Sequence, residues 1–197
     1  MQKKCRMFYA YKTVDIIKGG FYLLSSVSDL VHIRPFEEKD ISNKIKWINN
    51  PKNNMYLHYD LPLEFDKTLE WFKKNKERTD RYDAVIQVNN IAVGLIGLLG
   101  IDKKNRKAEF YISMGEEEYK GKGVAYKACK ILLAYSFKEL NLNKVYLNVD
   151  ADNIAACRLY EKVGFVCEGV FKEDMFFRGK FIDRKRYAIL RESFYEV

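Results

Sequence analysis

Hydrophobic residues in the first third of the chain recur at helical spacing. Ile41, Ile45 and Ile48 are three or four residues apart, which predicts an amphipathic helix over 37–48. Asp66 is a suitable N-cap for a second helix, because its carboxylate can accept hydrogen bonds from free N–H groups of the first turn. The sequence therefore predicts two helices ahead of its strand-rich middle.

The middle of the chain has the two-residue period of strands. Segments 84–88 and 91–99 flank an Asn-Asn pair, and asparagine tolerates the positive φ angles of a two-residue hairpin turn. A further strand is predicted over 108–114, and an earlier one over 31–35. Because strands follow one another here without an intervening helix, we expect them to be antiparallel.

The last third mixes both periods. We predict an apolar helix from Val124 to Phe137, a strand over 144–149, and a helix that Asn153 caps and Gly164 ends. A long hairpin around an Arg-Gly turn then covers 165–190. The element order indicates the α+β class.

The length of 197 residues favours one domain, which we assign to residues 31–197. Residues 1–30 are predicted to be an N-terminal extension of unclear role, with a short strand at 21–24. No run approaches 18 apolar residues, so no membrane partner is expected. The four cysteines lack Cys-x-x-Cys spacing and are expected to be free thiols in a reducing cytoplasm. With two histidines in the chain, no metal site is expected.

The formal net charge of +8 favours an anionic partner. The 35 basic residues are interleaved with 27 acidic ones, and no aromatic-basic RNA motif is visible. A small polyphosphate fits this distribution better than nucleic acid, and we expect no nucleic-acid partner.

A glycine-rich turn precedes the central helix. Gly121 and Gly123 allow a tight bend that brings backbone N–H groups close to an anion, and the helix dipole adds positive potential there. Lys120, Lys122 and Lys127 add full charges. The turn is either a phosphate cradle or a plain solvated loop. It does not sit where a dinucleotide-binding turn would, and the Gly-Lys-Ser/Thr of a P-loop is absent.

Two segments resemble the GNAT N-acetyltransferases. Segment 120–125 (KGKGVA) is similar to the family's Gln/Arg-x-x-Gly-x-Gly/Ala pyrophosphate signature, with Lys where the family prefers Gln or Arg. Segment 153–165 (NIAACRLYEKVGF) resembles Asn-x-x-Ala-x-x-Leu-Tyr-Glu-Lys-x-Gly-Phe. The resemblance covers about 31–190 and is to the branch that acetylates ribosomal proteins, amino sugars and spermidine.

The resemblance implies a mixed, largely antiparallel sheet with about four helices and splayed central strands that hold acetyl-CoA. It also implies direct transfer of the acetyl group to a primary amine. The implied cofactor-binding residues are Ile112, Ser113, Met114, Lys120, Gly121, Lys122, Gly123, Val124, Ala125, Asn153 and Ala156.

Two residues are the implied catalytic groups. Tyr160 is placed to protonate the departing CoA thiolate, and Glu109 is the candidate base acting through water. Each has an alternative interpretation: Tyr160 also falls on the apolar stripe of its helix, and Glu109 could be a solvated or salt-bridged strand residue.

The acceptor stays open between amino sugars, polyamines, antibiotics and protein N-termini. A polyamine would favour acidic residues, available at Glu64, Asp66, Glu168, Glu173 and Asp174. A nucleotide sugar would favour aromatic and basic residues, available at Tyr56, His58, Tyr59 and Arg178. The alternative function is a non-catalytic GNAT-fold module that binds CoA or a partner. The aromatic final hairpin makes a homodimer a further hypothesis.

Overall fold

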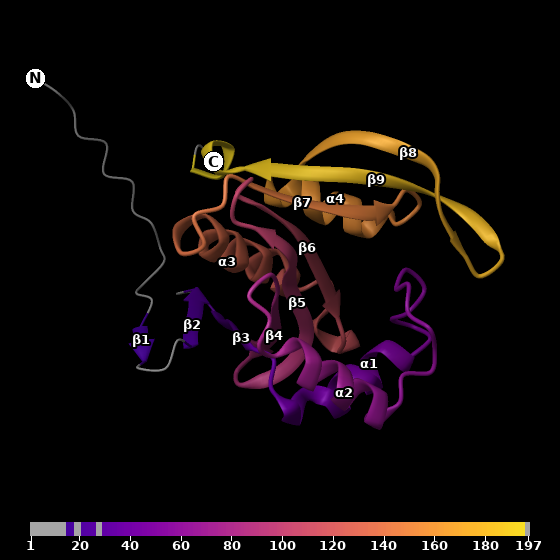
Figure 1. Ribbon diagram of the computed structural model, residues 1–197, viewed down its shortest axis with the longest axis horizontal. Coiled ribbons are helices and arrows are strands. Elements are labelled where there is room, and N and C mark those ends of the chain that lie inside the picture. Colours follow the sequence, from indigo (N-terminus) through magenta and orange to yellow (C-terminus); the bar gives the residue numbers. More distant parts are fainter. Residues whose placement is uncertain (1–14, 18–20, 27–28, 196–197) are drawn as a thin grey trace, which may run out of the picture.

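A computed structural model describes residues 15–17, 21–26 and 29–195 (Figure 1). Within these ranges nine strands form one sheet in the order β1-β2-β3-β4-β5-β6-β7-β9-β8. The strands are β1 (Asp15–Ile17), β2 (Phe21–Ser26), β3 (Asp29–Pro35), β4 (Tyr82–Val88), β5 (Ile91–Asp102), β6 (Lys107–Met114), β7 (Lys144–Asp150), β8 (Val166–Phe177) and β9 (Lys180–Leu190). The helices are α1 (Ile41–Asn49), α2 (Phe65–Asn75), α3 (Val124–Lys138), α4 (Ile154–Val163) and α5 (Arg191–Tyr195), with 3-10 turns at Glu38–Asp40 and Glu117–Tyr119.

The central strands β6 and β7 are parallel, whereas the other neighbouring strands pair antiparallel. Their register runs from Lys107 opposite Lys144 to Glu109 opposite Tyr146 and then stops. Beyond that point β6 continues on β5 and β7 continues on β9, so the two halves of the sheet diverge (Figure 1). The predicted splay of the central strands is therefore present.

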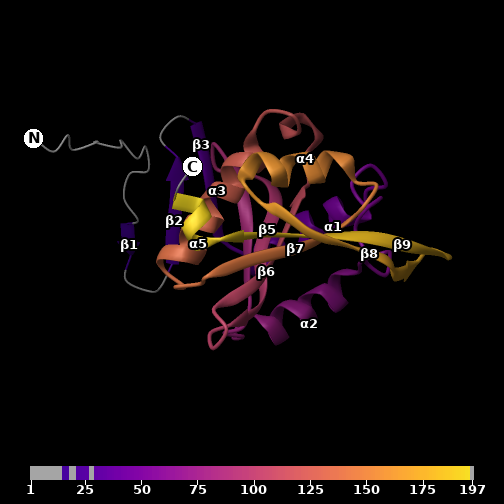
Figure 2. The same cartoon turned by 90° about the horizontal axis from the view of Figure 1, so that it is seen from above.

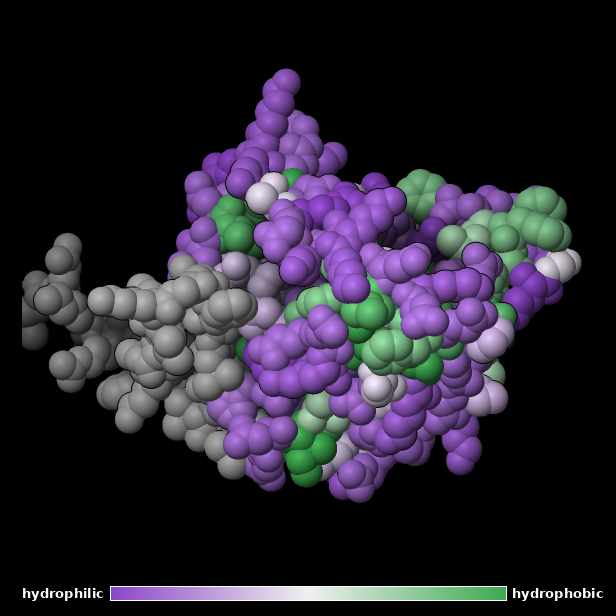
Figure 3. All heavy atoms as spheres, turned by 60° about the horizontal axis from the view of Figure 1, so that its bottom comes forward, coloured by the Kyte–Doolittle hydropathy of each residue, from purple (hydrophilic) through white to green (hydrophobic). Residues whose placement is uncertain are grey.

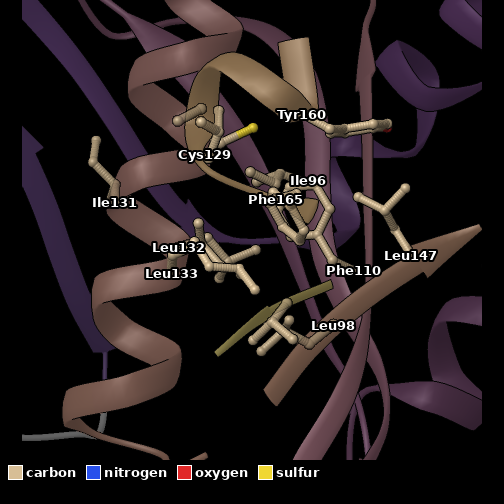
Figure 4. Close-up of a cluster of buried hydrophobic side chains, with 14 of the residues drawn as sticks. Ile96, Leu98, Phe110, Cys129, Ile131, Leu132, Leu133, Leu147, Tyr160 and Phe165 are labelled. Carbon is tan, nitrogen blue, oxygen red and sulfur yellow. The ribbon is translucent and has the colours of Figure 1, made fainter. Parts of the chain in front are cut away.

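Helices cover both faces of the sheet. Seen from above, α4 lies on one side of the sheet and α2 on the other (Figure 2). The larger core packs α3 and α4 against the strands, with Leu132 and Leu133 of α3 fully buried against Ile96, Leu98 and Phe110 (Figure 4). The smaller core, around Trp47 and Ile48 of α1, lies against the opposite face. Alternation along β6 sends successive side chains to the two cores.

Turn and capping residues in the sequence predicted the positions of most helices and strands correctly. Asn89 and Asn90 have φ angles of 51° and 66° in the β4–β5 turn, as predicted. The side chain of Asn153 accepts the Ala156 N–H at 3.2 Å, and Gly164 ends α4 with φ 109°. The hairpin expected over 165–190 is β8–β9.

Two helix starts were predicted wrongly. The helix expected over 37–48 begins as a 3-10 turn, and α1 starts only at Ile41, because Asp40 turns back to accept the Glu37 N–H and binds Arg34. The N-cap of α2 is Glu64 rather than Asp66, since its carbonyl already accepts the N–H and hydroxyl of Thr68. Helix α5 and strand β1 carried too short a pattern to be predicted.

The β8–β9 hairpin extends past the body of the protein (Figure 1). Phe176 and Phe181 face each other across its end, with ring centroids 5.0 Å apart, and are 63% and 61% exposed. Hydrophobic side chains gather at the corresponding end of the surface (Figure 3). This hairpin is the part of the described chain where large aromatic groups are most open to solvent.

Candidate active site

The glycine turn ahead of α3 has the geometry of an anion cradle. Gly121 and Gly123 have φ angles of 71° and 78°, in the left-handed region that disfavours other residues. A Cβ at either position would meet open space, so the concave side of the turn is unfilled. No side chain caps α3, which leaves the N–H groups of its first turn available to an anion.

Lys120 is anchored beside this turn rather than extended into solvent. Its ammonium donates to Asn53 Oδ1 and to Glu117 Oε2, each at 2.8 Å. Asn53 in turn donates from Nδ2 to the Gly115 carbonyl at 2.8 Å. Lys122, by contrast, is exposed on the turn itself. The cradle is therefore tied to the segment between α1 and α2.

A cavity of about 890 Å³ occupies the gap where β6 and β7 diverge. Because the gap passes through the sheet, the lining comes from both faces: Tyr160 from α4 on one side, Trp71 from α2 on the other. Eight sequence-predicted site residues line it, namely Ile112, Ser113, Met114, Lys120, Ala125, Asn153, Ala156 and Tyr160. The others lie outside the lining, namely Glu109, Gly121, Lys122, Gly123 and Val124.

Tyr160 stands at the edge of the larger core, where it borders the cavity. Its ring packs against Phe110 and Phe165 at centroid distances of 6.4 and 5.9 Å, and its hydroxyl points away from the side chains of α3 (Figure 4). Burial raises the pKa of the hydroxyl well above that of free tyrosine. No described residue hydrogen-bonds to the hydroxyl, so a neutral O–H faces the cavity and can serve as a proton donor.

Glu109 is the last residue of β6 that pairs with β7, and it lies outside the cavity lining. Its Oε1 accepts a hydrogen bond from Asn148 Nδ2 at 3.0 Å, and Asn148 itself lines the cavity. The Asn148 Oδ1 accepts from Arg186 Nε at 3.2 Å. The role of Glu109 as base stays a prediction. Its link to the cavity is the hydrogen bond with Asn148.

A carboxylate–imidazole pair lies within the cavity wall. His58 Nε2 is 3.0 Å from Asp150 Oδ2, and the Asp150 side chain is 4% exposed. Its Oδ1 is buried without a hydrogen-bond partner. Sequence reasoning placed His58 in the aromatic and basic set that would suit a nucleotide sugar, and it did not single out Asp150. The available signal was an aspartate at the C-terminal end of a strand that borders the splay.

The opposite wall of the cavity is basic and aromatic. Lys44 lies with its ammonium 3.1 Å from the centroid of Trp71, and burial lowers its pKa to about 7. Arg81 pairs with Asp83 through two hydrogen bonds of 2.6 and 2.8 Å, and Tyr111 donates to Asp83 at 2.6 Å. The Asp83 carboxylate on this wall is therefore already paired with a cation.

The acidic residues expected around a polyamine do not line the cavity. Three of them form ion pairs: Glu64 with Lys67, which is itself in the lining, Glu168 with Lys144 and Asp174 with Arg184. Of the aromatic and basic set, Tyr56, His58 and Tyr59 are in the lining, while Arg178 contacts Asn54 at 3.4 Å outside it.

The splayed sheet, the uncapped glycine turn and the cavity between them are the features of an acetyl-CoA-dependent acyltransferase. The Acetyltransferase (GNAT) domain model matches residues 31–166, and the chain belongs to this family. It is an N-acetyltransferase that uses acetyl-CoA as the acetyl donor and an amine as the acceptor.

The relatives narrow the comparison further. Spermidine N(1)-acetyltransferase of Vibrio cholerae is 36% identical over 82% of this chain and 94% of its own length. A crystal structure of spermidine N-acetyltransferase from the same organism, in complex with CoA and spermine, matches with a TM-score of 0.79 and 33% identity, covering 84% of this chain and 98% of that one. A dodecameric structure of that enzyme, in an intermediate state, matches 84% of this chain and 96% of that one with a TM-score of 0.73 and 32% identity.

Two further observations concern the described part of the chain alone. None of its helices combines the length and apolar character needed to cross a membrane. In the same residues, no group of three or more His, Cys, Asp or Glu side chains is arranged to hold a metal ion.

Proposed function

We propose that this enzyme acetylates a terminal primary amine of an aliphatic polyamine of the spermidine type. The observation that carries the proposal is the cavity between the diverging strands β6 and β7. It runs from the α3–α4 face to the aromatic side chains of Tyr56 and Tyr59 and to the buried carboxylate of Asp150. The spermidine N(1)-acetyltransferase of Vibrio cholerae, at 36% identity, supports the same acceptor.

The proposed donor site lies on the α3–α4 face. The N–H groups of Gly121, Gly123 and the first turn of α3 bind the pyrophosphate, assisted by Lys120 and Lys122. Residues 112–114 pair with β5 on one edge, and their other edge, which faces the gap, hydrogen-bonds the pantetheine arm and the thioester carbonyl together with Asn153 and Ala156. Tyr160 donates its proton to the departing thiolate.

The proposed acceptor site lies between Asp150 and the segment joining α1 to α2. An alkyl-ammonium chain places its methylenes on Tyr56 and Tyr59 and its charge beside Asp150 Oδ1, which otherwise has no partner. This arrangement replaces the acidic rim expected from the sequence, because one buried carboxylate attracts an ammonium more strongly than several solvated ones.

A second acceptor class is favoured by a specific observation. Lys44, Lys52, Lys67 and Arg81 also line the cavity; of these four cations, Arg81 pairs with Asp83 and Lys67 with Glu64. An amine that carries a phosphate, such as a nucleotide-linked amino sugar, would complement these charges. A cationic polyamine would be repelled by these lysine and arginine side chains, whereas a phosphate-bearing amine would be attracted to them.

A panel of acceptors separates them. We would measure kcat/KM for CoA release with spermidine, a nucleotide-linked amino sugar, an aminoglycoside and a peptide with a free N-terminus. Spermidine is expected to exceed the others by at least about tenfold. The matched variants Lys67→Glu and Lys73→Glu lie on the same helix, and only the first is in the cavity wall. Lys67→Glu should raise kcat/KM for spermidine; a preference for the nucleotide sugar, lost in Lys67→Glu, would overturn the polyamine assignment.

The remaining features of the proposal concern the whole protein. The enzyme acts in the cytoplasm, as one catalytic domain over 31–197 with residues 1–30 as an extension. It self-associates as a homodimer or larger homo-oligomer through the β8–β9 hairpin. The exposed Phe176 and Phe181 support this, as does the dodecameric structure of the Vibrio cholerae relative.

A further inference from the structure

We propose that His58 is the base that removes the proton from the acceptor ammonium and that Asp150 positions it. The assignment uses the N-acetyl transfer of the family and holds for any amine acceptor, so it does not depend on the polyamine proposal. It departs from the sequence-based expectation, in which Glu109 has this role.

The pair stands where both substrates must meet. Asp150 is the last residue of β7, on the part of that strand beyond the pairing with β6. His58 reaches it from the segment between α1 and α2, and both line the cavity together with Tyr160. Glu109 lies outside this lining. The base and the proposed acid therefore border one cavity.

The environment of the pair fixes its orientation. The Asp150 carbonyl accepts the Asn153 N–H at 3.0 Å, and the next residue, Ala151, donates to the Asp183 carbonyl at 2.9 Å, so the backbone that carries the carboxylate is held on both sides. The His58 ring packs edge-on against Phe177, with centroids 4.9 Å apart. A ring fixed by packing on one side and a carboxylate on the other cannot turn freely.

The hydrogen bond between them selects the tautomer. An ionised carboxylate only accepts, so Asp150 Oδ2 takes the hydrogen of Nε2 and the lone pair of neutral His58 is on Nδ1. No described residue hydrogen-bonds to Nδ1. The nitrogen that can accept a proton is thus the one left open to a substrate or to a water between them.

Few other charges face the imidazole. Its own segment supplies Tyr56 and Tyr59, and β8 supplies Phe177, over which the Arg178 guanidinium lies at 5.0 Å. On β9, Arg184 is the register partner of Asp150 and pairs with Asp174 at 3.4 Å. Asp150 is the carboxylate in direct contact with His58, and it stabilises the imidazolium that forms.

The proton balance of the reaction is complete with these groups. His58 Nδ1 takes one proton from the ammonium, and the freed amine attacks the thioester carbonyl carbon. The C–N bond forms, the C–S bond breaks, and the thiolate receives the Tyr160 proton. Tyr160 is restored by the second proton of the former amine, and His58 releases its proton to solvent. The products are the acetylated amine, CoA with a free thiol, and one proton released to solvent.

The pH dependence of kcat/KM tests the assignment, with spermidine or the best acceptor of the panel. His58→Gln should lower kcat/KM about 100- to 1000-fold at pH 7. Because an alkyl amine loses its own proton near pH 10, the deficit should then shrink by about tenfold for each pH unit gained. Glu109→Gln tests the competing assignment: if His58 is the base, the pH profile of Glu109→Gln should keep the shape of the wild-type profile, whatever its absolute rate. A His58→Gln deficit that stays constant from pH 7 to 10, or a pH-dependent recovery in Glu109→Gln instead, would overturn the proposal.

A spectroscopic measurement needs no acceptor. The chain has two histidines, so the ¹⁵N signals of His58 are identified by their loss in His58→Gln. The neutral wild-type ring should carry hydrogen on Nε2, and Asp150→Asn should shift the population to the other tautomer while the melting temperature stays within a few degrees. An Nδ1–H tautomer in the wild type, or the same tautomer in both proteins, would contradict the positioning role of Asp150.

Discussion

The ammonium of Lys120 donates to Asn53 Oδ1 at 2.8 Å, across 67 residues of sequence. One partner belongs to the turn that precedes α3 and the other to the segment between α1 and α2. The same Asn53 amide reaches the Gly115 carbonyl at 2.8 Å and the Trp47 carbonyl at 3.3 Å. The proposed donor and acceptor sites thus share one asparagine.

Removing that asparagine should weaken binding of the donor. Asn53→Ala removes one of the two acceptors of Lys120, with Glu117 remaining, and leaves the Gly115 carbonyl without this partner, which costs about 1–2 kcal/mol of folding stability. We expect the Kd for CoA to rise about three- to tenfold by calorimetry. Asn105→Ala is the control, since Asn105 also makes hydrogen bonds but lies in the β5–β6 turn outside the cavity. Equal CoA affinity in both variants would show that the link is structural only.

The two left-handed glycines at 123 and 179 form a matched pair. Both have φ near 79° and open space where a Cβ would lie, but Gly179 is in the distant β8–β9 turn. Each change to alanine should lower the free energy of unfolding by about 1–2 kcal/mol. Gly123→Ala alone should weaken CoA binding, by about tenfold or more, because its methyl group enters the cradle. If Gly179→Ala weakens CoA binding equally, the turn is not the pyrophosphate site.

Loss of the Tyr160 hydroxyl should slow the chemical step. We expect Tyr160→Phe to reduce kcat about 10- to 1000-fold with little change in CoA affinity, because the ring packing remains and only the proton donor is removed. Tyr82→Phe is the control: burial also raises the pKa of the Tyr82 hydroxyl, but that residue is outside the cavity. An unchanged kcat in Tyr160→Phe would reduce the tyrosine to a packing residue.

The buried Lys44 should make stability depend on pH. Its pKa falls from 10.5 in the unfolded chain to about 7 in the fold, so between these values the unfolded state binds the extra proton and stability rises with pH. Lys44→Met should therefore stabilise the protein by about 2–4 kcal/mol below pH 7, with the gain vanishing near pH 10.5. Urea titrations at pH 6, 8 and 10 measure this, with the exposed Lys73→Met as control. A pH-independent gain would mean that Lys44 is charged throughout.

The projecting hairpin should control assembly. Replacing both Phe176 and Phe181 by serine removes the exposed aromatic pair without touching either core. Light scattering should show a fall in molar mass at unchanged melting temperature. Phe65→Ser, at 50% exposure on α2, is the control and should leave the mass as it was. A wild-type enzyme that is already monomeric at micromolar concentration would rule out this mode of association.

Local patterns predicted most of the fold because its elements are specified by neighbours in sequence. Asn153 and Gly164 bound α4 through contacts within a few residues, and the same holds for the Asn-Asn turn. The family motifs located the residues of the α3–α4 side of the cavity for the same reason. The start of α1 was predicted too early because the Asp40 carboxylate binds Arg34 and does not cap the helix.

The other side of the cavity could not be predicted locally. His58 and Asp150 are 92 residues apart, and the sheet order that brings them together is a tertiary property. The same is true of Lys44 over Trp71, since a lysine in a helical pattern is normally assigned to the solvated face. The predicted acidic rim around a polyamine is absent from the cavity because Glu64, Glu168 and Asp174 pair with nearby lysine or arginine side chains instead.

The short ladder between β6 and β7 also has a consequence for the lifetime of the protein. Backbone groups of 112–114 that face the gap gain partners only when a molecule seats between the strands. Bound acetyl-CoA would therefore complete the hydrogen bonding of the sheet at this gap as well as supply the acetyl group. At a hundred times its Kd it would add about 2.7 kcal/mol to the stability of the native state. Resistance of this enzyme to proteolysis should accordingly follow the metabolic supply of its own substrate.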